Sequence, residues 1–304
     1  MDLKQIVILA LLVSVLGVRV LAGQELEPGA YDVAPVGVNV VTAAYTFSHG
    51  DIGFDPAVPL DDTLAHINTL ALSYARSINL GGRSGQIGIA VPLITGQVQA
   101  RYRGDLYRVN RTGLADPRVR IAINLFGAPA MDLKTLARNR PRTTVGTSVS
   151  IVMPVGQYDA QRLLNLGTNR WAFKPEVAVT HRVAGWTLEL YGGVWLFTTN
   201  TDFYQGARRE QQPIGEMQFH VAYTFRPGLA ATFNSNFYTG GRTTIDGRRN
   251  FDFQQNSRVG GTMKLPLGDR SGLRVAVSWG AYTTVGAAFT SVSMAYLYKW
   301  GAGL

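Results

Sequence analysis

Cysteine is absent from the 304 residues of this chain, which excludes disulfide bonds, cysteine-based metal sites and a lipid anchor on cysteine. Charged residues are scarce, at 16% of the chain, yet the mean hydropathy is only +0.04 because apolar residues do not gather in long runs. Beyond residue 22, no stretch approaches the roughly 18 apolar residues of a membrane helix. These absences argue against a disulfide scaffold and a bundle of membrane helices.

The first 22 residues have the features of a secretion signal. Lys4 supplies the positive start, residues 6–16 form an apolar run, and residues 20–22 (VLA) form a cleavage site. The apolar run is too short to span a membrane comfortably, so we expect cleavage after Ala22 rather than an uncleaved anchor. The mature protein is then an exported one.

From about residue 36 to residue 300, apolar and polar residues alternate in segments of roughly ten, each followed by a turn signal; residues 216–225 (EMQFHVAYTF) are one example. Side chains of a strand point to opposite faces in turn, so each segment has one apolar and one polar face. About twelve such segments behind a secretion signal predict an all-β protein, a transmembrane antiparallel β-barrel in the outer membrane of a Gram-negative bacterium. A soluble β-sandwich alternates similarly, but the segment lengths and the aromatic residues near segment ends favour the barrel.

The connections between these segments also follow the pattern of a barrel. Long and short connections alternate, as expected for external loops and periplasmic turns, and an even strand count places both termini in the periplasm. One long connection, residues 127–142, falls on the periplasmic side, and a short helix is expected there over Met131–Arg138. The chain therefore divides into a signal peptide (1–22), a lead-in that lies in the barrel or the periplasm (23–35), and a single barrel domain (36–304). The expected strands are 36–48, 65–77, 85–95, 117–126, 143–153, 171–182, 186–198, 214–226, 229–239, 253–265, 272–282 and 287–300.

Most charged residues of the segments lie opposite the apolar positions, and hence inside the barrel. A Lys or Arg that faced lipid at the bilayer midplane would cost about 2–4 kcal/mol, which supports this assignment. These side chains either line a basic channel that attracts anions or fill a narrow lumen with salt bridges. The candidate lumen-lining residues are Arg118, Arg120, Lys174, Glu176, Glu189, Glu216, His220, Asn234, Asn236, Arg258, Lys264 and Arg274.

The four histidines do not form a recognisable catalytic or metal-binding pattern. None has a serine two residues away on the same strand face, as outer-membrane phospholipases require. His49 with Asp51, or His66 with two nearby aspartates, resembles the acidic rim of an outer-membrane protease, but solvated loop residues explain these positions equally well. We therefore expect no enzyme, no metal and no cofactor. An outer-membrane hydrolase is kept as an alternative, ranked after the two readings given below.

Several segments resemble the phenol MetA-pathway family of outer-membrane proteins. The most specific lie at 154–159 (PVGQYD), 165–171 (NLGTNRW) and 173–176 (FKPE), with further likeness at 113–117 (GLADP), 240–244 (GGRTT) and 35–39 (PVGVN). The resemblance implies a transporter, in some cases one linked to uptake of aromatic or other hydrophobic compounds, and it supplies no catalytic residue. A non-conducting structural or interaction barrel is the main alternative.

Two sets of external residues are candidates for function. A mouth loop, which we expect to fold over or into the opening, includes Asn165, Gly167, Asn169, Arg170 and Trp171. The net charge is +9, and external arginines such as Arg208, Arg209, Arg248 and Arg249 suit the phosphates of lipopolysaccharide. Nothing indicates a nucleic-acid partner, and the expected partners are outer-membrane lipid, lipopolysaccharide, a small-molecule substrate and, during biogenesis, the barrel-assembly machinery.

Overall fold

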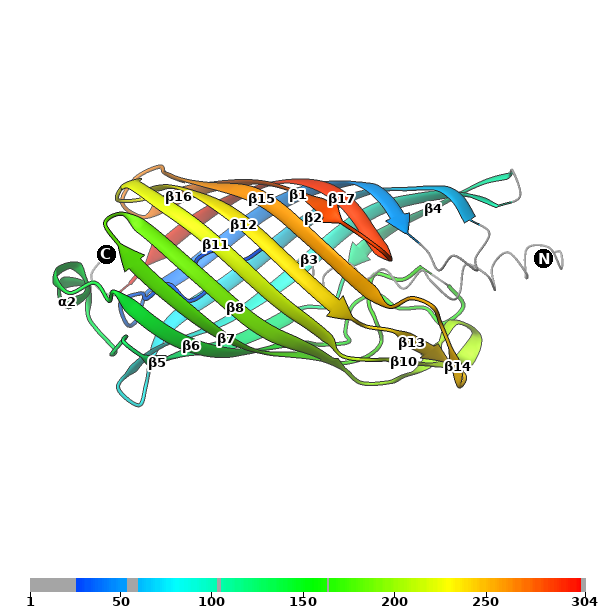
Figure 1. Ribbon diagram of the computed structural model, residues 1–304, viewed down its shortest axis with the longest axis horizontal. Coiled ribbons are helices and arrows are strands. Elements are labelled where there is room, and N and C mark those ends of the chain that lie inside the picture. The colour runs from blue at the N-terminus through cyan, green and yellow to red at the C-terminus, as the bar shows by residue number, and fades with distance from the viewer. Residues whose placement is uncertain (1–25, 54–59, 103–104, 163, 302–304) are drawn as a thin grey trace.

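The computed structural model describes residues 26–53, 60–102, 105–162 and 164–301. Within them, long strands form one antiparallel sheet that closes on itself as a barrel (Figure 1). Because β4 and β5 follow each other along β3, they count as one interrupted strand, and the barrel has twelve strands. This confirms the predicted fold; the predicted signal peptide lies outside the described residues. The strands are β1 (Asn39–Gly53), β2 (Leu60–Leu80), β3 (Arg83–Tyr102), β4 (Asp105–Leu114), β5 (Arg118–Phe126), β6 (Thr143–Val152), β7 (Ala172–Val183), β8 (Trp186–Phe197), β11 (Ile214–Arg226), β12 (Leu229–Gly240), β15 (Gln254–Pro266), β16 (Ser271–Tyr282) and β17 (Gly286–Trp300).

The barrel closes where the first strand pairs with the last. The β1–β17 register runs without a break from Asn39 opposite Trp300 to Gly53 opposite Gly286. Closure leaves no open sheet edge along the wall, so backbone N–H and C=O groups are satisfied without water. Among the described residues, no helix is long and apolar enough to cross a membrane.

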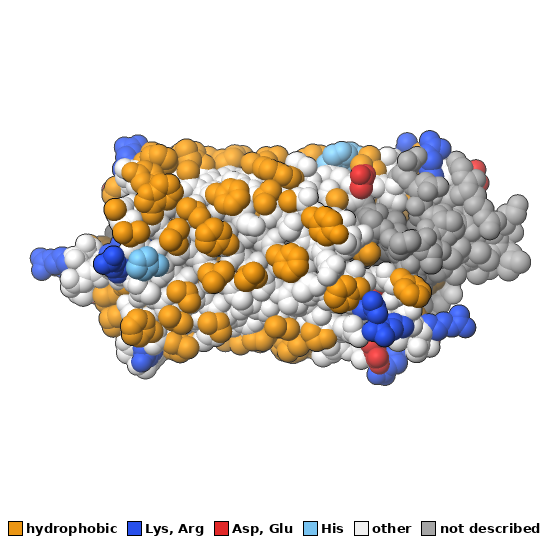
Figure 2. Space-filling view, viewed as in Figure 1, with side chains coloured by type: hydrophobic (Ala, Val, Ile, Leu, Met, Phe, Trp, Pro, Cys, Tyr) orange, Lys and Arg blue, Asp and Glu red, His pale blue; other side chains and the backbone are white. Residues whose placement is uncertain are grey.

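The outer and inner faces of the strands differ as the alternation predicted. On β11, Met217 and Phe219 are exposed on the outer face, whereas Gln218 and His220 between them are buried. Figure 2 shows apolar side chains across the middle of the face in view, with charged side chains toward the two ends, and exposed apolar residues on the other strands continue this apolar belt. An apolar belt of this kind requires lipid around it, because such a large exposed apolar surface is not stable in water. The protein is therefore an outer-membrane protein.

The two ends of the barrel differ in their connections. The short-turn end carries tight turns, the last residues of β17 and the helix α2 (Leu133–Arg138) (Figure 1). The Asp132 side chain accepts a hydrogen bond from the backbone N–H of Thr135, which caps the helix. Hydrogen bonding to the Thr135 side chain and to this backbone N–H lowers the pKa of Asp132. The sequence predicted this helix, with its start two residues earlier.

The opposite, long-loop end contains strands that the sequence did not predict. Residues 96–116, expected to be a loop, extend β3 and form β4, and the expected loops at 200–213 and 240–252 contribute to a small four-stranded sheet. These strands lie beyond the apolar belt, so they carry no apolar face from which alternation could be recognised. The small sheet consists of β9 (Asn200–Phe203), β10 (Ala207–Gln211), β13 (Thr243–Ile245) and β14 (Arg248–Arg249), with the 3-10 turn η1 (Tyr204–Gly206) between β9 and β10.

Candidate functional site: the occupied lumen and a recess in the wall

Residues 26–38, here called the lumenal segment, lie inside the barrel ahead of β1. The backbone N–H of Glu27 donates to Gln218 Oε1 on β11 at 3.1 Å, and that of Gly29 donates to Glu189 Oε2 on β8 at 2.9 Å. Near the short-turn end the segment reaches Ser77 of β2, whose carbonyl accepts from the Gly37 N–H. The segment therefore crosses the lumen and contacts opposite parts of its wall.

Tyr31 of the lumenal segment is buried, with 3% exposure. Its hydroxyl lies 2.7 Å from Ser148 Oγ on β6 and donates to Glu176 Oε1 on β7 at 2.9 Å. Arg120 of β5 lies over the ring, 4.6 Å from its centroid. Gly146 of β6 makes room for this ring, because a Cβ there would lie 2.6 Å from Tyr31 Cδ1. The wall thus contains a pocket for one side chain of the lumenal segment.

Acidic groups of the lumenal segment pair with basic groups of the wall. Glu27 Oε1 lies 2.7 Å from the Arg118 guanidinium on β5. Asp32 lies 2.8 Å from Arg182 on β7 and 3.6 Å from Lys264 on β15. Two predicted lumen residues, Arg118 and Lys264, therefore bind the segment electrostatically instead of facing an open channel.

A buried ion cluster on the inner face connects β7 with β11 across the intervening strand β8. Lys174 Nζ on β7 lies 3.1 Å from Glu176 Oε2 and 3.6 Å from Glu216 Oε2 on β11, and all three side chains are at most 6% exposed. Glu216 also accepts hydrogen bonds from the Trp195 indole at 3.0 Å and from Asn236 Nδ2 at 2.7 Å. Glu216 thus has Lys174, Trp195 and Asn236 around it, whereas the partners of the Glu176 carboxylate are Lys174 and the Tyr31 hydroxyl.

The remaining predicted lumen residues form hydrogen-bond networks on other strands. His220 Nδ1 lies 2.8 Å from Asn234 Oδ1, and Asn234 Nδ2 donates to Thr262 Oγ1 at 2.9 Å. Arg258 donates to Ser278 Oγ at 3.0 Å. Arg274 on β16 stands directly across from Lys264 on β15. These side chains lie on the inner face of the barrel and bond to neighbouring strands, although His220 Nε2 and Arg258 Nε have no hydrogen-bond partner among the described residues.

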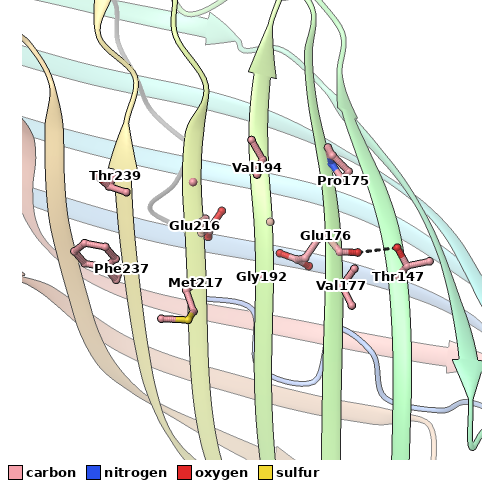
Figure 3. Close-up of a pocket in the computed structure, with 12 residues that line it drawn as sticks. Thr147, Pro175, Glu176, Val177, Gly192, Val194, Glu216, Met217, Phe237 and Thr239 are labelled. Atoms are coloured by element: carbon pink, nitrogen blue, oxygen red, sulfur yellow. Dashed lines mark hydrogen bonds between the residues drawn. The ribbon is translucent and has the colours of Figure 1, made fainter.

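The outer wall has a recess at the level of this cluster (Figure 3). It has a volume of about 580 Å³ and extends from β6 to β12. Gly192 on β8 and Gly215 on β11 form its floor, and a side chain at Gly192 would meet no other atom within 4 Å. Apolar side chains that face outward surround the glycines; they are Val177, Val194, Met217 and Phe237.

The β7–β8 ladder is interrupted at the recess. The register pairs Phe173 with Leu196 and resumes only with Glu176 and Gly193. Pro175 lies in this gap, and proline has no N–H to donate to a neighbouring strand. The recess therefore coincides with an interruption of the β-ladder in the wall, and Glu176 and Glu216 border it from the inner side (Figure 3).

The predicted mouth loop folds into the long-loop end of the barrel. Leu166 is 8% exposed and packs with Ala65 and Ile67 of β2, Ile94 of β3 and Phe289 of β17. These four residues belong to the inner face of β2, β3 and β17, whereas the loop lies between β6 and β7 in sequence. The segment around Leu166 therefore reaches across the mouth.

Asp116 holds this loop in place from the break between β4 and β5. Its Oδ1 accepts from the Gly156 N–H at 2.9 Å, and its Oδ2 accepts from the backbone N–H and the hydroxyl of Thr168, each at 2.7 Å. Asp116 and the loop belong to two of the segments that carried the sequence resemblance, and the carboxylate joins them.

The five predicted mouth residues take different places. Asn165 closes the loop through its side chain, which bonds the backbone of Asp159 and Arg162. The other four flank it on the way to β7. The Gly167 N–H donates to the Gln157 carbonyl, and Asn169 Nδ2 donates to Asn200 Oδ1. Arg170 is buried over the Phe197 ring. Trp171 is exposed on the outer face beside Phe173.

We expect Asp116→Ala to release the mouth loop without unfolding the barrel. The substitution removes three hydrogen bonds to a charged acceptor, each worth about 1.5–3 kcal/mol. The backbone N–H groups of Gly156 and Thr168 then lose the carboxylate that accepts from them. Trypsin should then cut after the exposed Arg162 at least several times faster than in the wild type. Asp202→Asn, which changes an exposed carboxylate at the same end, is the matched control. Equal cleavage rates in all three proteins would contradict the assignment.

A sequence comparison assigns the chain to a family. Residues 27–298 match the family described as "Putative MetA-pathway of phenol degradation". The chain belongs to this family. The predicted resemblance is thereby confirmed, and the matched range covers the lumenal segment as well as the barrel. No curated protein sequence matches the chain.

Solved barrels resemble this member of the phenol MetA-pathway family in fold. The COG4313 outer membrane channel from Pseudomonas putida F1 is 21% identical, with a TM-score of 0.76 over 91% of this chain and 100% of that one. The beta domain of the Bordetella autotransporter Brka is 11% identical, with a TM-score of 0.53 over 87% of this chain and 100% of that one. The translocator domain of autotransporter NalP from Neisseria meningitidis is 8% identical, with a TM-score of 0.52 over 88% and 90%.

Sequence reasoning missed the residues that occupy the lumen and the defect in the wall. Glu27, Tyr31 and Asp32 lie outside any alternating segment, and no local pattern connects them with partners that are 91 or more residues away in sequence. Pro175 did give a signal, since proline in a closed ladder is unfavourable. That signal could have located the interruption of the β7–β8 ladder beside the recess.

Proposed function

We propose that this protein carries small hydrophobic molecules across the outer membrane, and that they pass between lipid and the barrel interior through the wall recess. The observation that carries the proposal is the recess itself, an apolar hollow over Gly192 and Gly215 beside an interrupted β-ladder. The lumenal segment and the mouth loop occupy the lumen, which disfavours a wide aqueous pore for polar solutes.

The chemistry of the recess suits an uncharged apolar ligand. Its rim consists of Val177, Val194, Met217 and Phe237, and burial of apolar surface there contributes about 25 cal/mol per Å². On the inner side, the carboxylates of Glu176 and Glu216 are engaged with Lys174 and offer a ligand no free charge. The description of the family names phenol degradation, which makes small aromatic molecules the first substrates to test.

The orientation in the membrane follows from the lengths of the connections. We infer that the short-turn end, with α2 and the end of β17, faces the periplasm, and that the long-loop end is external. A polar pocket of about 310 Å³ between β4 and residues 157–166 then opens outward. Arg111 and Arg162 line it, which suits the phosphates of lipopolysaccharide. Arg209, in contrast, is buried over the Phe203 ring and is a weaker candidate than its exposed neighbour Arg208.

The test uses entry of N-phenyl-1-naphthylamine, a neutral aromatic dye that an intact lipopolysaccharide leaflet excludes, into whole cells. Expression of the wild type should raise the rate of dye entry several-fold over cells with empty vector. Gly192→Trp, which fills the recess, should return the rate close to that of the vector. Ala43→Trp, on the outer face of β1, adds the same bulk elsewhere on the belt and is the control.

The alternative readings give different results in the same cells. Dye entry at the vector rate, with folded protein in the membrane, would favour the structural or interaction barrel and overturn transport. We expect no esterase or protease turnover by the purified protein. Equal rates for the wild type and Gly192→Trp, both above vector, would retain transport and exclude the recess as its route.

A further inference from the structure

Two histidines meet on the outer face of the barrel. The β1–β2 register places His49 directly opposite His66, although 17 residues separate them in sequence. Their Nδ1 atoms are 3.2 Å apart, and the ring centroids are 4.4 Å apart with an angle of 34° between the rings. Neither side chain faces the lumen, because both share the outward parity of Phe47 and Leu70.

The pair lies where the apolar belt ends toward the long loops. On β1, Phe47 precedes His49 on the outer face and belongs to the belt, whereas Asp51 follows on the same face and is exposed. Thr290 of β17, the register partner of His49 on the other side, is also exposed. Water and ions therefore reach the two imidazoles, and an acidic residue stands next to them.

The geometry suits a shared metal ion. Zinc binds imidazole nitrogen at about 2.0–2.1 Å, so two nitrogens on one tetrahedral ion lie about 3.3 Å apart, close to the distance between the two Nδ1 atoms. Imidazole is a preferred ligand of Zn²⁺, Cu²⁺ and Ni²⁺, and Cu²⁺ binds most tightly of the three. We propose that His49 and His66 chelate a divalent transition-metal ion at the outer border of the membrane.

The other histidines of the chain provide a contrast. His181 lies 2.8 Å from the Thr143 hydroxyl and His220 lies 2.8 Å from Asn234 Oδ1, so each has a single polar partner of another type. Within the described residues, no three His, Cys, Asp or Glu side chains converge as a metal site. Water or an anionic oxygen from the lipid surface therefore completes the coordination of the two-histidine site. Bound metal ties β1 to β2 where both strands leave the belt.

The experiment measures metal binding by the refolded mature protein in detergent micelles. Titration calorimetry with ZnCl₂ and with CuCl₂ gives affinity and stoichiometry, and electron paramagnetic resonance of the Cu²⁺ form reports nitrogen ligands. The variants are His49→Gln, His66→Gln and, as a control, His181→Gln at the opposite end of the barrel. Heat-modifiable gel mobility verifies that each variant is folded.

The expected result is one saturable site per chain with nitrogen hyperfine structure in the Cu²⁺ spectrum. Either His49→Gln or His66→Gln should weaken binding about tenfold or abolish it, because each removes one of two chelating nitrogens, whereas His181→Gln should bind as the wild type does. Zn²⁺ should also raise the temperature of heat modification of the wild type, but not that of His49→Gln or His66→Gln. Absence of saturable binding, or equal binding by folded His49→Gln, would overturn the proposal and leave the pair as a hydrogen bond between neutral imidazoles.

Discussion

Deleting residues 27–33 should convert the protein into a conducting pore. These residues carry Glu27, Tyr31 and Asp32, which bind the wall on β5, β6, β7 and β15. Without them, the part of the lumen beside β5, β6, β7 and β15 is no longer occupied by the segment. The wall keeps all its strand-to-strand hydrogen bonds. Single-channel recordings of the refolded variant in planar bilayers should show a unitary conductance several times that of the wild type.

The energetics favour release of the lumenal segment over unfolding of the barrel. A hydrogen bond contributes about 0.5–1.5 kcal/mol net, and fixing one residue's backbone costs about 1–2 kcal/mol, so the contacts and the ordering cost of the segment are similar in size. The wall, in contrast, has a neighbouring strand on both sides of every strand, and its β7–β8 ladder is interrupted only locally, between Phe173 and Glu176. The pore should also prefer anions, because the predicted lumen residues include six basic and three acidic side chains and the deletion removes two further carboxylates.

A conservative variant tests whether the bonds of the lumenal segment to the wall, and not only its volume, keep the lumen closed. Glu27→Gln, Tyr31→Phe and Asp32→Asn together keep the size of the side chains but weaken their bonds to Arg118, Glu176 and Arg182. This triple variant should open briefly and frequently, with full-size openings like those of the deletion. A folded deletion variant with wild-type conductance would disprove the role of the segment as the obstruction.

Replacing Lys174 by Met should cause the largest loss of stability of any single substitution considered for this barrel. Lys174 is the ammonium that both Glu176 and Glu216 contact, at 3.1 and 3.6 Å, and its side chain is 1% exposed. Removing one partner of a buried ion pair typically costs about 3–5 kcal/mol, since the remaining charges stay buried without compensation. Urea unfolding in micelles, followed by loss of the heat-modifiable form, measures the effect.

Lys264→Met is the matched control for this prediction. Lys264 also faces inward and pairs with a carboxylate, but its side chain is 32% exposed and its partner Asp32 belongs to the lumenal segment. We expect a change of about 1 kcal/mol or less, as for other partly solvated ion pairs. Combining Lys174→Met with Glu176→Gln and Glu216→Gln should restore much of the lost stability. An unaltered unfolding midpoint for Lys174→Met would show that the cluster contributes specificity rather than stability.

The wall of the barrel was predictable from sequence because lipid imposes a pattern on it. Each outward residue must be apolar and each charged residue must face inward, so the parity of residues such as Glu189, Asn236 and Arg258 followed from their neighbours alone. The helix over Leu133–Arg138 was recognisable from its composition. Strands outside the belt, such as β4 and β10, were not predicted. Both faces of these strands can be polar in water, so their sequences need not alternate between apolar and polar residues.

The contents of the lumen were not predictable by the same reasoning. Strand alternation gives the face of each side chain but not its partner, which depends on register and on what enters the barrel. Tyr31 meets Ser148 and Glu176 only because the chain ahead of β1 turns back into the lumen. The pairing of His49 with His66 likewise needs the β1–β2 register, and their spacing in sequence matches no known ligand motif.

The pairing of β1 with β17 has a consequence for how the barrel forms. Asn39 and Trp300 are separated by most of the chain, and contacts between such distant residues are the slowest to form. This seam should therefore close last, while β2 to β16 are already assembled as a curved open sheet. The lumenal segment is joined directly to β1, so it can settle against the concave surface of that sheet before the last strand seals it inside. The obstruction of the finished barrel is thus built in during folding, and no separate insertion step is required.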